Sequence, residues 1–166
     1  MRSSIGPVTL PAFLDLPPRS VKPRTVGVTH VIDQGAGTAA TADLLASAAG
    51  HIDIWKVGWG TSYVDSALPA KLALLDAHDV AACLGGTMLE IAWAQGAAEA
   101  CLEWAGEVGF RLIEVSRGTV AMSMQEKREL IKRASRDFTV LAETGAKSPG
   151  ERNPARHWPA ECLSDL

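Results

Sequence analysis

Five charged side chains at or near the ends of apolar runs in this 166-residue sequence have the right types for chemistry on a small anion. They are Asp33, Lys56, Glu114, Glu143 and Lys147. Three carboxylates at one site would favour Mg²⁺, which prefers oxygen ligands. Two lysines would favour an anionic substrate, and a desolvated lysine can act as a general acid or base near neutral pH. A structural role stays open for each, because strand-end carboxylates often cap loops and a lysine can simply pair with a neighbouring carboxylate.

Two glycine-containing segments follow apolar runs and predict loops that bind an anion. The first reads Lys-Val-Gly-Trp-Gly-Thr-Ser at 56–62, and the second reads Gly-Gly-Thr at 85–87. Glycines let backbone N–H groups approach an anion closely, and the hydroxyls would add donors before the next helix begins. The alternative is a plain strand-to-helix turn, because glycine pairs are common in turns. The residues predicted to bind substrate in these loops are Thr61, Ser62, Gly85, Gly86 and Thr87.

The elements that would position these residues alternate between apolar strands and helices. Strands are predicted at 26–33, 52–57, 80–84, 110–115 and 138–142. Helices are predicted at 38–49, from 65 or 66 to 78, at 89–109 with a break near Gly96, and at 123–136 behind the capping box Ser123–Glu126. The strand centres recur about every 28 residues, which favours a parallel sheet with helical crossovers.

This spacing predicts an α/β fold of the (β/α)₈ TIM-barrel type, with about five βα units present. Residues 1–24 contain several prolines and are predicted to form a leader, and residues 25–166 the partial barrel domain, ending before a sixth strand. The alternative is an open doubly wound sheet. Against it, no G-x-G-x-x-G follows the first strand, and polar residues stand at every strand exit rather than at about two.

Composition excludes several classes of function. A net charge of −3 does not suit a nucleic-acid partner, whose binding surface should be basic. No apolar run approaches the ~18 residues needed to span a membrane. Cys83, Cys101 and Cys162 lack metal-binding spacing and favour reduced thiols in the cytoplasm, with Cys83 in the core. His30 lies inside a predicted strand and favours a core position over a ligand role.

Four motifs together resemble the phosphosulfolactate synthase family. They are Lys-x-Gly-Trp-Gly-Thr-Ser at 56–62, Gly-Gly-Thr-x-x-Glu at 85–90, Gly-Phe-x-x-Ile-Glu-x-Ser at 109–116 and Glu-x-Gly-x-Lys at 143–147. The resemblance implies a (β/α)₈ barrel that adds sulfite to phosphoenolpyruvate with Mg²⁺, giving (R)-phosphosulfolactate for coenzyme M synthesis. It also implies that Lys147, Lys56 and Glu143 are catalytic and that Asp33 and Glu114 bind the metal. Arg117 departs from the family pattern, and its positive charge predicts that it joins the loop residues above in binding substrate.

Three positions depart from the family pattern. Gln34, Arg117 and Ala146 stand where the family has lysine, aspartate and lysine. Arg117 would suit a bidentate phosphate or sulfonate contact, or it would block the metal. These changes leave enzymatic activity uncertain and keep open an alternative, a non-catalytic or fragmentary barrel relative with a structural or stress-related role.

Five βα units would leave the first and fifth strands as sheet edges. Both carry apolar side chains, and a monomer would expose more apolar area than soluble monomers usually show. The sequence therefore predicts a homo-oligomer.

Overall fold

The computed structural model describes residues 13–145, which form a parallel sheet with helices along it. The strands are β1 (His30–Asp33), β2 (Ile54–Val57), β3 (Ala81–Leu84), β4 (Leu112–Val115) and β5 (Thr139–Ala142). The helices are α1 (Thr38–Ala48), η1 (Ala49–His51), α2 (Trp59–Val64), α3 (Leu68–Ala77), α4 (Gly86–Ala94), α5 (Ala98–Val108) and α6 (Met124–Ala134). Ala146, Lys147 and Cys162 lie outside the described residues.

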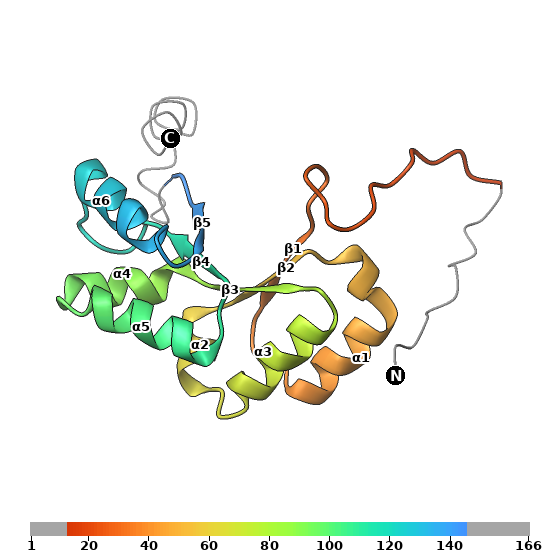
Figure 1. Cartoon of the computed structure of the whole chain (residues 1–166), viewed down its shortest axis with the longest axis horizontal. Helices are drawn as coiled ribbons and strands as arrows, with labels where there is room; N and C mark the ends of the chain where they lie inside the picture. Colours follow the sequence, from red (N-terminus) through yellow and green to blue (C-terminus); the bar gives the residue numbers. More distant parts are fainter. Residues whose placement is uncertain (1–12, 146–166) are drawn as a thin grey trace.

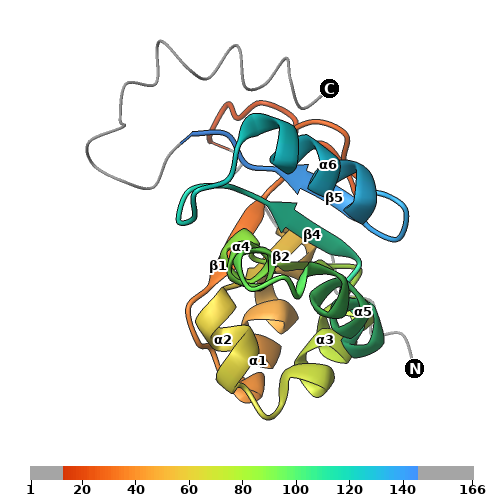
Figure 2. The same ribbon diagram turned by 90° about the vertical axis from the view of Figure 1, so that its left-hand side faces the viewer.

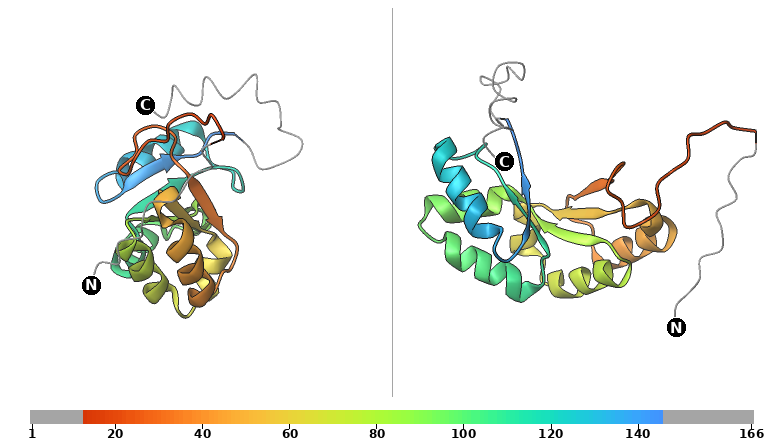
Figure 3. Two further views of the ribbon diagram at one scale, coloured as in Figure 1. Left: turned by 90° about the vertical axis from the view of Figure 1, so that its right-hand side faces the viewer. Right: turned by 45° about the horizontal axis from the view of Figure 1, so that its top comes forward.

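The five strands pair in sequence order, and every neighbouring pair is parallel. The helices follow one side of the sheet, from α1 near β1 to α6 near β5 (Figure 1). Figure 2 and Figure 3 show how the sheet twists from β1 to β5, with the helices staying on that side. A doubly wound sheet would reverse its strand order and carry helices on both faces. The structure therefore confirms an α/β fold of (β/α)₈ type with about five units.

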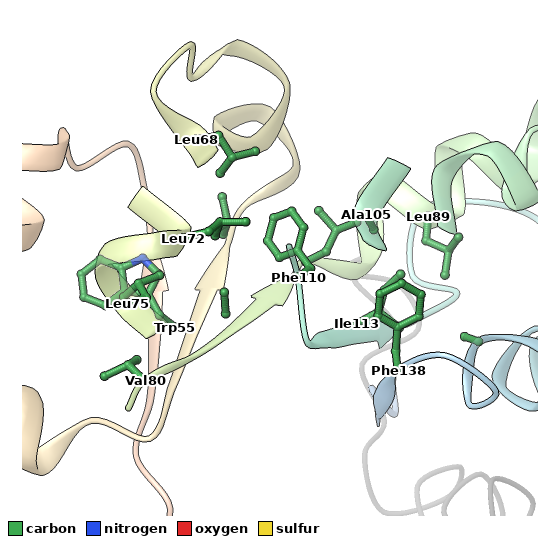
Figure 4. Close-up of a cluster of buried hydrophobic side chains, with 14 of the residues drawn as sticks. Trp55, Leu68, Leu72, Leu75, Val80, Leu89, Ala105, Phe110, Ile113 and Phe138 are labelled. Atoms are coloured by element: carbon green, nitrogen blue, oxygen red, sulfur yellow. The ribbon is translucent and has the colours of Figure 1, made fainter. Parts of the chain in front are cut away.

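The core lies between the sheet and the helices. Side chains alternate between the two faces of a strand, and those on the helix side are almost inaccessible, including Trp55, Val57, Leu84, Ile113 and Val115. Figure 4 shows Trp55 close to Leu72 and Leu75 of α3, and Ile113 close to Phe138. No helix within residues 13–145 has the length and apolar composition needed to cross a membrane.

Residues 13–29 contain no helix or strand and attach to the amino end of the sheet. The Arg24 guanidinium donates to Asp53 Oδ1 at 2.8 Å and to the Gly50 carbonyl at 2.7 Å. Asp53 Oδ2 accepts from the Thr29 N–H at 2.8 Å, and Lys22 donates to the Asp79 carbonyl. This end of the molecule is thus held by the leader, and the opposite end carries the predicted site.

Two predicted loops are helical instead. The sequence pattern predicts loops at 58–62 and 86–87, but α2 begins at Trp59 and α4 begins at Gly86. Gly58 and Gly85 are the N-caps, each with an extended backbone, so a single residue turns the chain from strand to helix. The predicted helix break at Gly96, where φ is +71°, and the capping box at Ser123 are both confirmed.

Candidate functional site

The predicted strand-tip residues gather at one end of the sheet. Asp33 is the last residue of β1, Lys56 and Glu114 are the third residues of their four-residue strands, and Glu143 directly follows β5. Because all the strands are parallel, these positions share the carboxyl end of the sheet. That is where α/β enzymes place their ligands.

The strand register separates these residues onto two faces. Asp33 pairs with Val57, and Val57 pairs with Leu84, whose side chains face the helices. Lys56 is one residue earlier and pairs with Cys83, so both face the inner, concave side of the sheet. Glu114 follows Ile113, the partner of Leu84, and therefore shares the inner face with Lys56. The structure thus brings Lys56 and Glu114 together but leaves Asp33 on the other face.

Lys56 and Glu114 form an ion pair across β3. Lys56 Nζ lies 2.8 Å from Glu114 Oε2, and their side chains are 19% and 7% exposed. The other carboxylate oxygen of Glu114 accepts from the Gly86 N–H at 3.2 Å, at the first residue of α4. This site therefore places a partly buried ammonium group, a carboxylate and a helix N-terminus within one contact network.

Two more inner-face residues adjoin the ion pair. Cys83 is fully buried, as predicted, and burial together with the nearby Glu114 raises the pKa of its thiol to about 12. The thiol thus stays protonated at neutral pH and is a packing group. His30 is exposed rather than in the core, because β1 lies at the edge of the sheet that residues 13–145 form. Although the residue as a whole is exposed, partial desolvation of its imidazole and then the charge of Lys56 lower the pKa of His30, which favours the neutral imidazole at pH 7.

Asp33 belongs to a buried ion network that was not predicted from the sequence. Its Oδ2 lies 3.0 Å from Nζ of Lys71 in α3, and Lys71 also lies 2.6 Å from Asp65 Oδ2. The side chains of Asp33 and Lys71 are both 0% exposed. Asp33 Oδ1 accepts from the backbone N–H groups of Gly35 and Ala36, each at 2.8 Å. Both oxygens of Asp33 are thus committed to holding the β1 exit loop and α3.

A sequence signal for Lys71 existed. It lies three residues after Leu68 and four before Leu75, on the apolar stripe that α3 buries. A lysine on such a stripe has to find a carboxylate, because an unpaired buried charge is strongly unfavourable. Lys127 of α6 is also buried, and its ammonium group donates to the backbone carbonyl of Glu143 at 2.8 Å.

The predicted metal pair is not assembled. Asp33 and Glu114 lie on opposite faces of the sheet, and each carboxylate is engaged by a lysine. Asp33 also accepts from two backbone N–H groups, and Glu114 accepts from one. Within residues 13–145, no group of three or more His, Cys, Asp or Glu side chains is arranged to hold a metal ion. Both carboxylate oxygens of Asp33 thus have partners within the protein, and Mg²⁺ binding by Asp33 and Glu114 stays a prediction.

The predicted substrate-binding residues are placed differently from one another. Ser62 is buried, and its hydroxyl donates to the Trp59 carbonyl within α2, so it is directed to its own helix. Thr61 and Thr87 are partly exposed in the first turns of α2 and α4. The glycines at 85 and 86 are buried, and close packing requires both. A Cβ on Gly85 would lie 2.9 Å from the Val57 carbonyl, and one on Gly86 would lie 3.1 Å from Glu114 Oε1.

Comparison with known proteins agrees with this architecture. The family model for (2R)-phospho-3-sulfolactate synthase matches residues 17–166. The chain belongs to this family. It is 38% identical to the phosphosulfolactate synthase of Methanothermobacter thermautotrophicus over 136 residues, covering 80% of this chain and 53% of that protein. It is 34% identical to the Bacillus subtilis protein of the same name over 155 residues, covering 92% of this chain and 62% of the relative.

A third phosphosulfolactate synthase, from Methanocaldococcus jannaschii, is 33% identical over 126 residues, which is 74% of this chain and 50% of that protein. The chain thus spans about half to three-fifths of the length of the curated relatives it matches. The matched segment includes all five described strands, because the family model begins at residue 17.

Proposed function

We propose that this chain carries out the phosphosulfolactate synthase reaction, in which sulfite adds to phosphoenolpyruvate. The sulfur lone pair forms a bond to C3, the π electrons of the C2–C3 bond move toward the carboxylate, and a proton is then delivered to C2. The product is (R)-phosphosulfolactate, and nothing is oxidised or reduced overall. The family membership supports the reaction, and the partly buried Lys56–Glu114 pair at the carboxyl end of the sheet is the observation that carries it.

Lys56 is the cation best placed to meet the substrate carboxylate in this proposal. Its side chain is 19% exposed on the inner face, which supports access by an anion from the mouth of the sheet. Negative charge grows on the substrate carboxylate as sulfite attacks, and a fixed cation stabilises that charge in the transition state. Lys147, by its place in the family motif, is proposed to deliver the proton to C2, and Glu143 is proposed as its catalytic neighbour.

Mg²⁺ is the cofactor that the resemblance implies, but the described residues do not fit it at Asp33. Both oxygens of that carboxylate already accept hydrogen bonds in a site without exposure. Glu114 would have to release Lys56 to become a ligand. The proposed chemistry therefore uses the side chains of the chain itself. Calorimetric titration with Mg²⁺ tests the point: Glu114→Ala should weaken any binding, whereas Asp33→Ala should change folding stability rather than metal affinity.

The experiment that tests the reaction compares purified wild-type chain with Lys56→Met and, as a matched control, Lys132→Met on the exposed side of α6. Phosphoenolpyruvate and sulfite are supplied together, and product is followed by ³¹P NMR. Removing a charge that stabilises the transition state should lower kcat by about 10²–10³-fold, and the control should not change it. Equal activity of Lys56→Met and wild type would contradict the role of Lys56.

Absence of product in the wild-type chain would favour the alternative, a non-catalytic relative with a structural or stress-related role. The departures at Gln34 and Arg117 are the observations behind that alternative. We also propose a cytoplasmic location, because Cys83 and Cys101 are free cysteines, as is usual in reducing compartments.

A further inference from the structure

Glu90 is a fully buried carboxylate in α4, and it binds the loop that follows β4. Its Oε1 accepts from the Gly118 N–H at 3.1 Å and from the Ser116 hydroxyl. Its Oε2 accepts from the Thr119 N–H at 2.6 Å and from the Thr119 hydroxyl. One side chain thus accepts hydrogen bonds from residues on both sides of position 117.

These contacts determine where Arg117 stands. Ser116, Gly118 and Thr119 all donate hydrogen bonds to the buried carboxylate of Glu90, so the backbone at position 117 has little conformational freedom. Arg117 itself is partly exposed and lines a hollow of about 440 Å³ with the following residues up to Ser123. An arginine whose backbone is already fixed loses less conformational entropy on binding an oxyanion than an arginine in a flexible loop does.

The loop is also tied to the Lys56–Glu114 pair. Gly86 opens the same helix that carries Glu90, and its N–H donates to Glu114. A Cβ at Gly86 would collide with the Ser116 hydroxyl and crowd the Glu114 carboxylate, so the start of α4 lies directly against the end of β4. Helix α4 therefore aligns the Arg117 loop with the ion pair at the mouth.

We propose that Glu90 is a positioning residue: it holds the 116–119 loop so that Arg117 binds an oxyanion, either the tetrahedral phosphate of phosphoenolpyruvate or the pyramidal sulfite ion. The proposal rests on the proposed function for the identity of the anion. Glu90 acts only through the loop and does not touch substrate. Arg117 is thus a specificity-determining cation, at a position where the resembled family pattern has aspartate.

The test uses the whole 166-residue chain and the variants Glu90→Gln, Arg117→Ala and the double variant. Glu103→Gln, an exposed glutamate of α5, is the matched control. Glutamine keeps the shape of Glu90 but turns an NH₂ group toward the loop donors. Amide hydrogen exchange at Gly118 and Thr119 reports loop order. Calorimetry with phosphoenolpyruvate and with sulfite, each alone, reports which anion Arg117 binds.

Glu90→Gln should speed exchange at both amides by about tenfold or more and weaken binding of one anion by about tenfold. Arg117→Ala should weaken binding of the same anion without changing amide hydrogen exchange at Gly118 and Thr119. The double variant should bind no more weakly than Arg117→Ala, because Glu90 acts through Arg117. If Glu90→Gln does not fold, Thr119→Val replaces it, since it removes one hydroxyl donor and keeps the side-chain shape.

Unchanged exchange in Glu90→Gln, or in its replacement Thr119→Val, overturns the positioning role. Additive losses in the double variant also overturn it, because they show that Glu90 acts independently of Arg117. Failure of the wild-type chain to bind either anion, or unchanged binding by Arg117→Ala, overturns the anion-binding role. A turnover assay on the same samples tests the proposed reaction separately from the positioning role of Glu90. If the chain binds an anion through Arg117 but forms no product, the reaction is contradicted and the positioning role is supported.

Discussion

The buried network of Asp33, Lys71 and Asp65 gives a sharp test of how the carboxyl end of the sheet is held. Lys71→Met keeps most of the aliphatic length of lysine and removes only the ammonium group. That group lies 3.0 Å from one carboxylate and 2.6 Å from the other, with no exposure of its own side chain. Removing one partner of a buried ion pair leaves an uncompensated charge and typically costs about 3–5 kcal/mol.

The expected loss of stability is a large part of the total free energy of unfolding, because that free energy is only about 5–15 kcal/mol for a typical domain. With a urea m value of about 2 kcal/mol/M, the midpoint of unfolding should fall by roughly 2 M. Circular dichroism during urea titration measures it. Lys132→Met is the matched control and should stay within about 0.5 kcal/mol of wild type, because that lysine is exposed.

The effect should depend on pH in a defined direction. Burial alone would raise the pKa of Asp33, but the Lys71 ammonium and the backbone N–H groups of Gly35 and Ala36 outweigh it and hold the pKa below its ordinary value of 3.8. Hydrogen bonding from Lys71 likewise lowers the pKa of Asp65. Stability from depressed carboxyl pKa values is present above pH 3.8 and is lost as pH falls below it.

The pKa of Lys71 determines the upper end of the pH range in which the ion network stabilises the fold. Burial alone would lower its pKa, but Asp65 and Asp33 outweigh burial and raise the pKa above 10.5, so its contribution is lost only in strong base. The difference between Lys71→Met and wild type should therefore be full at pH 7 and smaller at pH 3. A loss below about 1 kcal/mol at pH 7 would refute the ion network as a stabilising feature. A loss of the same size at pH 3 and pH 7 would show that packing, not charge, is responsible.

Two further predictions follow from packing and from the sheet edges. Gly86→Ala should destabilise the chain by about 1–3 kcal/mol, because its Cβ would lie 3.1 Å from the Glu114 carbonyl and from Glu114 Oε1. A Cβ at Gly60 would have no neighbouring atom within 4 Å among the described residues, so Gly60→Ala should instead be neutral or stabilising, and urea unfolding compares the two variants. Light scattering should show a homo-oligomer, because β1 and β5 are edge strands in the described part of the chain and Ile32 on the inner face is 58% exposed. A cooperatively melting monomer would contradict that expectation.

The strand order and the shared end of the site could be predicted from sequence, because both depend on a repeating pattern. Apolar runs about every 28 residues specify parallel units, and the residue that follows each run must lie at the carboxyl end. Strand lengths were overestimated, most for β1, where 26–29 were predicted as strand but only His30–Asp33 pair. Residues 26–29 connect the leader to the amino end of the sheet, and their apolar side chains remain exposed at Val26 and Val28.

The roles of the charged residues could not be predicted in the same way, because role depends on which face of the strand a side chain occupies. A shift of one residue moves a side chain to the other face, and sequence-predicted strand ends are uncertain by more than that. Asp33 and Glu114 therefore appeared equivalent in sequence but have different partners in the structure. The prediction of loops at 58–62 and 86–87 was wrong because a single N-cap glycine, Gly58 or Gly85, is enough to turn the chain from strand to helix.

The contacts of the acidic residues at this end of the sheet indicate which charges remain available to a ligand. Asp33 neutralises Lys71, Glu114 neutralises Lys56, and Glu90 accepts donors from the β4 exit loop. The Lys56–Glu114 pair has no net charge, so on its own it attracts an anion only weakly from a distance. A cation at 117 in place of the aspartate of the resembled family pattern changes the local charge by two units in the positive direction. Under the proposed role of Arg117, therefore, the carboxylates build the mouth of the sheet, and the added positive charge at Arg117 determines which anion binds there.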